Sequence, residues 1–118
     1  MAAQNDPERH DGSRRPKNNH IISRKKFREY VAAHPEAAKD KVMFDRFYKV
    51  VKQAAWMKFA DVKATFGTAD QVGDLVVFNI GGHKYRVIAR IDYRRARVYI
   101  RHVLTHDEYD KGRWKDDA

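Results

Sequence analysis

Residues 75–104 have the sequence LVVFNIGGHKYRVIARIDYRRARVYIRHVL, and this stretch determines the expected fold. It opens with a continuous apolar run over 75–80, which is typical of a strand buried on both faces. The two glycines that follow supply the positive φ angles of a tight hairpin turn. Apolar and polar side chains then alternate over 83–92 and again over 97–104. The stretch therefore predicts three consecutive antiparallel strands.

The two alternating strands can be sorted by face, because successive side chains point to opposite sides of a sheet. A turn centred on Arg94 and Arg95 gives the cross-strand pairs Asp92 with Arg97, Arg90 with Tyr99, and Ile88 with Arg101. This register places the apolar side chains against the helices and gathers a basic set on the open face. The residues expected in that basic set are Lys84, Arg86, Arg90, Arg97, Tyr99 and Arg101. Guanidinium groups fork onto phosphate oxygens and a tyrosine can stack on a base, so the face predicts RNA binding; a solvated sheet face is the alternative.

The residues before this stretch predict a short strand and helices. Residues 21–22 indicate a strand, and Ser23 is suitably placed to cap the helix that follows. Apolar residues recur at helical spacing on both sides of Pro35, most strongly over 36–55, and a shorter helix is expected near 61–66. The main order β-α-α-β-β-β predicts an α+β fold in which two helices pack on one face of a small, mainly antiparallel sheet.

The composition is that of one small basic domain. The chain has 118 residues, 35% of them charged, and a formal net charge of +9, which favours a polyanionic partner such as nucleic acid. No run approaches the ~18 consecutive apolar residues of a membrane span, and the lack of cysteine excludes disulfides and thiolate chemistry. We expect a polar, disordered tail over 1–19, a single domain over 20–114 and a C-terminal end over 115–118, in a cytoplasmic protein with no membrane partner.

The segment after the last strand supplies groups for acid–base chemistry. Thr105 and Glu108 have the spacing of a capping box, which would place His106 and Tyr109 on one side of a short C-terminal helix. RNA carries its own nucleophile, the 2′-hydroxyl, so a nuclease without metal needs only a base, an acid and cations for the phosphorane. His106, Tyr109 and Arg86 could supply these three functions.

A metal site is the weaker alternative for the same segment. His102 and His106 are four residues apart, but His102 is expected on a strand and turned toward the core. No suitable acidic third ligand is evident. We therefore predict no metal and no cofactor.

Three segments resemble the HigB-type toxins, which belong to the RelE-like group of messenger-RNA interferases. They are HIISRKKF at 20–27, FNIGGHKYRVIARIDY at 78–93 and YIRHVLTHDEYDK at 99–111. The resemblance covers 20–111. It implies a RelE-like fold, cleavage of messenger RNA on translating ribosomes, and a helix-turn-helix antitoxin of the HigA type that neutralises the toxin and represses the operon.

The resemblance also implies roles for single residues. Arg86, in GG-x-x-Y-R, matches the arginine that RelE-like enzymes place near the scissile phosphate, and Tyr109, in TH-x-E-Y-D, matches their C-terminal tyrosine. His106 in that same motif is the candidate base. The residues expected to bind RNA are Lys84, Arg90, Arg97, Tyr99, Arg101 and Lys111. The predicted function is a toxin with metal-independent endoribonuclease activity; the alternatives are an RNA- or ribosome-binding protein without catalysis and a structural partner of an acidic protein.

Overall fold

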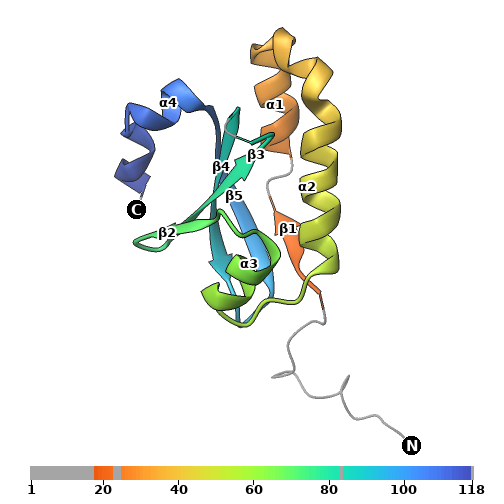
Figure 1. Ribbon diagram of the computed structural model, residues 1–118, viewed down its shortest axis with the longest axis vertical. Coiled ribbons are helices and arrows are strands. Elements are labelled where there is room, and N and C mark those ends of the chain that lie inside the picture. The colour runs from red at the N-terminus through yellow and green to blue at the C-terminus, as the bar shows by residue number, and fades with distance from the viewer. Residues whose placement is uncertain (1–17, 23–24, 83, 118) are drawn as a thin grey trace, which may run out of the picture.

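The computed structural model describes residues 18–22, 25–82 and 84–117, which form one sheet with helices on both faces (Figure 1). The elements are β1 (His20–Ile22), α1 (Lys25–Ala33), the 3-10 helix η1 (Pro35–Asp40), α2 (Lys41–Gln53), α3 (Phe59–Thr65), β2 (Asp70–Val72), β3 (Leu75–Ile80), β4 (Tyr85–Asp92), β5 (Arg97–Thr105), α4 (His106–Asp110) and the 3-10 helix η2 (Arg113–Asp117). The five strands lie in the order β1-β5-β4-β3-β2. β1 is parallel to β5, and the other three pairings are antiparallel.

The expected α+β class is confirmed, and the predicted order of elements is incomplete. It lacks β2, whose three residues DQV are too few and too polar to show the alternation that identifies a strand. β2 pairs with β3 and forms one edge of the sheet, while β1 forms the other edge. The parallel pairing of β1 with β5 makes the sheet mixed. This architecture is compatible with a RelE-like fold.

Aromatic side chains fill the space between the helices and one face of the sheet. On α2, Phe44, Phe47 and Tyr48 are all buried, as their helical spacing predicts. The Phe47 ring lies 5.0 Å from the ring of Phe78 on β3, and Trp56 stacks on Phe78 with a centroid distance of 6.0 Å. Such pairs add ~0.5–1.5 kcal/mol each beyond the burial of their apolar area. Helices α1 and α2 are thereby fixed on the same face of the sheet (Figure 1).

A proline separates the two long helices. Pro35 begins η1, and α2 starts only at Lys41 and ends at Gln53, so the helix expected over 36–55 is shorter at both ends. Proline lacks the N–H donor of a helix interior but is tolerated in the first turn, which accounts for its position. None of the described helices combines the length and the apolarity needed to cross a membrane.

The start of the described chain is bonded to the end of α2. Asn19 is buried, its backbone N–H donates to the carbonyl of Ala54 at 2.9 Å, and its side-chain amide donates to the carbonyl of Val51 at 3.1 Å. The folded unit therefore includes Asn19, which the sequence assigned to the tail. Residues 1–17 and the expected cap Ser23 lie outside the described residues.

Candidate functional site

The hairpin of β4 and β5 begins with the predicted register. Asp92 lies opposite Arg97, and Arg90 lies opposite Tyr99. These side chains share the sheet face that lies away from α1 and α2, and the side chains of Arg90 and Arg97 are exposed there. The half of this face near the 93–96 turn is therefore basic, with a tyrosine among the arginines.

The register changes farther along the hairpin. A shift between Ile88 and Ala89 places Ile88 opposite His102, not opposite Arg101, so the predicted pairing of Ile88 is wrong. β5 contains one extra residue at Arg101, and a bulge of this kind reverses the face of every later side chain in the strand. Strand alternation read from the sequence alone could not detect it.

Because of the bulge, two side chains lie on the face opposite to the one that strand alternation predicts. Unbroken alternation over 97–104 would place Val103 on the same face as Arg97 and Tyr99, but Val103 packs in the helix-side core. His102 was expected toward the core, yet it pairs with Ile88 on the opposite face, where Leu104 also packs. His102 therefore lies on the same face of the sheet as Arg86 and Tyr109.

A second, smaller apolar core lies on this opposite face. Its members are Leu75, Val77, Ile88 and Trp114, with Val72, Leu104 and Tyr109 packed against them. Because Tyr109 belongs to α4 and Trp114 to η2, the C-terminal segment covers part of the face that the sequence predicts to be open (Figure 1). The expected capping box at the start of α4 is present. Thr105 accepts a hydrogen bond from the backbone N–H of Glu108, and the Glu108 carboxylate accepts one from the backbone N–H of Thr105 at 2.8 Å.

Arg86 and Tyr109 are brought into contact by this arrangement. The guanidinium carbon of Arg86 lies 5.3 Å from the centroid of the Tyr109 ring, which is the distance of a cation–π contact. Arg86 is only 7% exposed, and its Nη1 donates to the carbonyl of Tyr85 at 3.3 Å. The Tyr109 ring also stacks on the indole ring of Trp114. A buried guanidinium is only weakly screened by water, so its charge acts strongly on a nearby phosphate.

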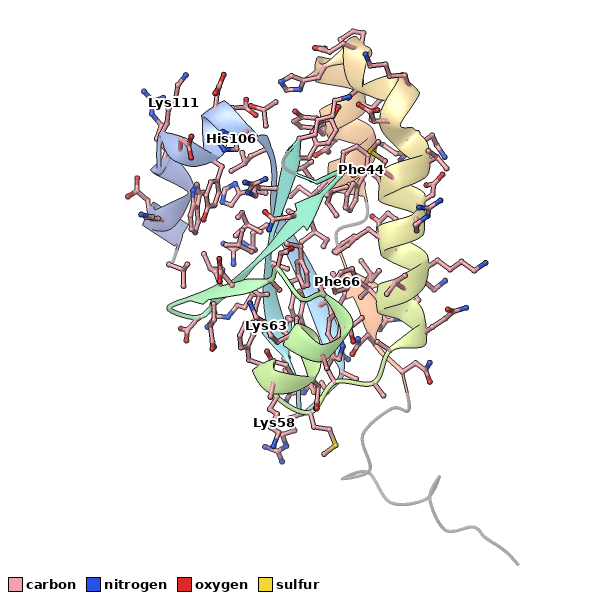
Figure 2. All side chains as sticks on the ribbon, in the orientation of Figure 1. Phe44, Lys58, Lys63, Phe66, His106 and Lys111 are labelled. Carbon is pink, nitrogen blue, oxygen red and sulfur yellow. The ribbon has the colours of Figure 1, made fainter. Side chains whose placement is uncertain are left out.

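His106 lies at the first position of α4 and is labelled in Figure 2. Its side chain is about half exposed, and its Nδ1 lies 3.1 Å from a carboxylate oxygen of Asp110. A carboxylate at one ring nitrogen orients the imidazole and leaves the other nitrogen for solvent or substrate. The sequence predicts His106 and the short helix that carries it, but not the contact with Asp110.

Lys84 occupies a different place from the one predicted. It lies in the turn before β4, and its Nζ forms a 2.8 Å ion pair with Asp40 of η1, on the helix side of the sheet. Strand alternation does not apply to Lys84, because β4 begins at Tyr85. The Tyr85 hydroxyl donates to the same carboxylate at 2.6 Å. The hydrogen bonds from Lys84 and then Tyr85 lower the pKa of Asp40, while burial, followed by the bond to Asp40, raises the pKa of Tyr85.

The remaining predicted RNA-binding residues follow the sheet face and the C-terminal segment. Arg90 has a long ion pair of 3.8 Å with Asp74 and stays largely exposed. Arg101, at the bulge, is half-buried. Lys111 lies after α4, on the segment shown in Figure 2. These positions extend the basic surface from the 93–96 turn toward α4.

A cavity of about 310 Å³ lies between β5 and the C-terminal segment. Its lining residues are His102, Leu104, Glu108, Lys111, Arg113 and Trp114. The lining carries the cations Lys111 and Arg113 together with the carboxylate of Glu108. Within the described part of the chain, no three histidine or carboxylate side chains are grouped as a metal ion would require.

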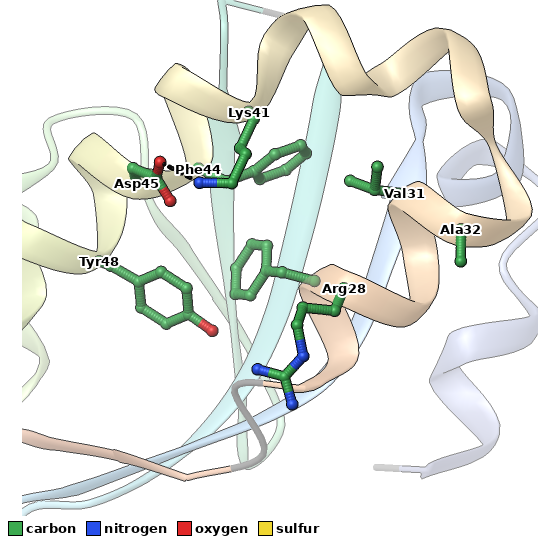
Figure 3. A pocket seen from close by; sticks show the side chains of 8 residues that line it. Arg28, Val31, Ala32, Lys41, Phe44, Asp45 and Tyr48 are labelled. Atoms are coloured by element: carbon green, nitrogen blue, oxygen red, sulfur yellow. Dashed lines mark hydrogen bonds and ion pairs between the residues drawn. The ribbon is translucent and has the colours of Figure 1, made fainter.

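A separate hollow of about 480 Å³ lies between α1 and α2 (Figure 3). It is lined by Phe27, Arg28, Val31, Ala32, Lys41, Phe44, Asp45 and Tyr48, and two of these residues, Lys41 and Asp45, form a 2.7 Å ion pair with each other. The hollow is mainly apolar and belongs to the helix layer. The exposed arginines Arg90 and Arg97 lie on the opposite face of the sheet.

The domain is basic, and its buried Arg86 contacts Tyr109 of α4, the helix that also carries His106. These residue types are suited to chemistry on RNA. Comparison with known families identifies the group. Residues 40–112 match the HigB toxin family, described as the RelE-like toxic component of a toxin–antitoxin system. The chain belongs to this family.

Individual relatives agree with the family match. The chain is 30% identical over 95 residues to the mRNA interferase HigB of Escherichia coli O6:H1, covering 78% of this chain and 89% of that protein. It is 30% identical over 94 residues to the mRNA interferase toxin HigB of Escherichia coli K12 and to the mRNA interferase HigB of Shigella flexneri, covering 77% of this chain and 88% of each relative. The resemblance read from the three sequence motifs is confirmed. The family match ends at residue 112, so η2 lies beyond it.

Proposed function

We propose that this toxin is an endoribonuclease that cuts messenger RNA at a site built from Arg86, Tyr109 and His106. The observation that carries the proposal is the contact between the buried Arg86 guanidinium and the Tyr109 ring. Two residues from the distant motifs GG-x-x-Y-R and TH-x-E-Y-D meet there on one face of the sheet. The names of the relatives, mRNA interferases, support the same substrate and reaction.

The proposed reaction begins with attack of the RNA 2′-hydroxyl on the adjacent phosphorus. Neutral His106 accepts the 2′-hydroxyl proton, and Asp110 holds the imidazole through the 3.1 Å contact with Nδ1, which becomes an ion pair once the ring is protonated. Arg86 stabilises the extra negative charge of the phosphorane. Tyr109 donates a proton to the leaving 5′ oxygen, which leaves a 2′,3′-cyclic phosphate and a 5′-hydroxyl end. No step in this sequence needs a metal or another cofactor.

The basic surface would hold the RNA strand against this site. Arg90, Arg97 and Arg101 supply cations for consecutive phosphates, and Tyr99 supplies a ring for base stacking. Lys111 extends the surface beyond α4. Lys84 is paired with Asp40 on the helix side of the sheet, so that carboxylate largely balances its charge and Lys84 adds little to the potential of the RNA face.

The proposed partners follow from the family. Toxins of toxin–antitoxin systems are paired with an antitoxin, and we propose a helix-turn-helix protein of the HigA type for this one. We also propose that cleavage occurs on translating ribosomes in the cytoplasm, where the message is presented as a single strand.

The decisive experiment uses a defined messenger RNA on programmed ribosomes, with cut sites mapped by primer extension. A single 2′-deoxy substitution at the mapped nucleotide is expected to abolish cleavage there. Arg86→Ala and Tyr109→Phe are each expected to lower kcat about 100- to 1,000-fold. Arg46→Ala, at an exposed arginine of α2, is the matched control and keeps the parent rate.

Two outcomes would refute the proposal. Cleavage of the 2′-deoxy message at the parent rate would exclude the 2′-hydroxyl as nucleophile. A message that stays intact, while the protein sediments with ribosomes, would identify a binding protein without catalysis.

The absence of a metal requirement is tested with a sulfur atom in place of each non-bridging oxygen at the cut site. Rescue of the slowed reaction by Mn²⁺ or Cd²⁺ would show a catalytic metal.

Binding is tested separately from catalysis. Arg97→Ala should lower the affinity for single-stranded RNA and reduce the slope of log K against log salt by about 0.7, because one phosphate contact is lost. An unchanged slope would remove Arg97 from the proposed RNA path.

A further inference from the structure

Trp114 makes two contacts with Tyr109. The two rings stack with centroids 5.0 Å apart and an interplanar angle of 13°. The indole Nε1 also donates a hydrogen bond to the backbone carbonyl of Tyr109 at 2.9 Å. One side chain therefore holds both the ring and the backbone of the tyrosine.

Trp114 is itself fixed on the sheet. It is 3% exposed and packs with Leu75, Val77 and Ile88. Among the η2 side chains that the structure describes, Trp114 is the one that is buried. The indole therefore anchors the 3-10 helix on the sheet, and the side chains that it packs against belong to two strands, β3 and β4.

The helix that carries Tyr109 cannot hold its own position. α4 has five residues, far below the ~12–15 residues at which an isolated helix becomes marginally stable in water. Its N-terminal end is held by the capping box of Thr105 and Glu108. At its C-terminal end, the contacts with Trp114 provide the corresponding support.

We propose that Trp114, which lies beyond the family match, is a positioning residue that holds Tyr109 against Arg86. This inference rests on the proposed function, since it assumes that Tyr109 acts in cleavage. The Tyr109 ring touches Arg86 and Trp114 at the same time, so a shift of the indole moves the phenol relative to the guanidinium. A displacement of about 1 Å near the reacting atoms can cost roughly 100-fold in rate.

The test compares two substitutions of Trp114 with one of Trp56. Trp114→Leu keeps apolar volume against the sheet but removes the ring and the N–H donor, and Trp114→Phe keeps a ring that can stack. Trp56→Leu is the matched control, because Trp56 is 1% exposed but lies in the helix-side core, away from Tyr109. Rates are measured on ribosomes programmed with the defined message, well below the Tm of each variant.

The expected pattern separates positioning from stability. Trp114→Leu should lower kcat about 10- to 100-fold with little change in KM, and Trp114→Phe should recover most of that loss. Trp56→Leu should lower Tm and leave kcat within about twofold of the parent. Should Trp114→Leu fail to fold, Trp114→Met, which is also apolar and lacks both the ring and the N–H donor, replaces it in both backgrounds.

A double-mutant cycle decides whether the effect passes through Tyr109. In a Tyr109→Phe background, Trp114→Leu should cost less than about threefold in kcat, because the group that it positions is already missing. Full kcat in folded Trp114→Leu, or an equal loss in both backgrounds, would overturn the proposal. If Tyr109→Phe and Arg86→Ala themselves leave cleavage unchanged, the proposed function fails first, and the two failures are distinguishable.

Discussion

Loss of the Thr105 cap should loosen α4 without unfolding the domain. The Thr105 hydroxyl takes part in two bonds with Glu108: it accepts from the backbone N–H at 3.2 Å and donates to the carboxylate at 3.2 Å. Thr105→Ala removes both. The bond from the Thr105 backbone N–H to the same carboxylate, at 2.8 Å, survives the substitution.

The size of the effect follows from the cap alone. Replacement of an N-cap threonine by alanine costs typically ~1 kcal/mol. A change of 1.4 kcal/mol is tenfold in an equilibrium constant, so ~1 kcal/mol raises the population of locally open α4 about fivefold. Tyr109 and His106 lie on this helix, so the activity depends on its closed form. The variant therefore remains active as long as the closed form still predominates.

Hydrogen exchange followed by mass spectrometry measures this opening directly. Peptides that cover 106–117 should exchange about fivefold faster in Thr105→Ala, while peptides from β3 and β4 keep the parent rate. Thr68→Ala, at an exposed threonine before β2, is the control. Unchanged exchange in the C-terminal peptides, or equal acceleration throughout the chain, would refute the argument that the capping box holds α4 locally.

Two further predictions concern the start of β4 and the turn before it. Tyr85→Phe should lower Tm at pH 7, because the bond that helps to lower the pKa of Asp40 is lost. A lowered carboxyl pKa contributes its full stability above the ordinary aspartate pKa of about 3.9 and loses it progressively as the pH falls through the lowered pKa, so thermal scans should show the difference from the parent narrowing in acid. A difference that grows in acid would contradict this account. Gly82→Ala should cost about 1–2 kcal/mol in urea unfolding for its positive φ, and Gly81→Ala about 1 kcal/mol more, because its Cβ would lie 2.7 Å from Sδ of Met43. Equal costs would show that the methionine moves aside freely.

The strands and helices with strong periodicity could be predicted from the sequence. The run 75–80, the glycine turn and the alternating segments correspond to β3, β4 and β5 of the structure. β2 escaped prediction because its pairing depends on β3 and not on a pattern of its own. The 3-10 start before α2 escaped as well, because α-helix and 3-10 helix share nearly the same apolar spacing over one turn.

The site could be predicted in part, and the errors have one type of cause. Arg86 and Tyr109 were recognised through motifs, which do not depend on a correct register. The positions of Lys84, His102 and Val103 were inferred by counting along a strand, and counting fails outside the strand and beyond a bulge. Trp114 was missed because a single aromatic residue near a chain end has no periodic partner that marks it as buried.

The bulge at Arg101 and the second apolar core depend on each other. Without the extra residue, Leu104 would point to the helix side, and the core around Trp114 would lose that side chain. α4 follows β5 directly, so the face on which the strand delivers its last residues also sets the side from which the helix leaves the sheet. A strand with unbroken alternation would direct Tyr109 toward the helix side, away from Arg86. One inserted residue in β5 therefore determines whether the two motifs can meet.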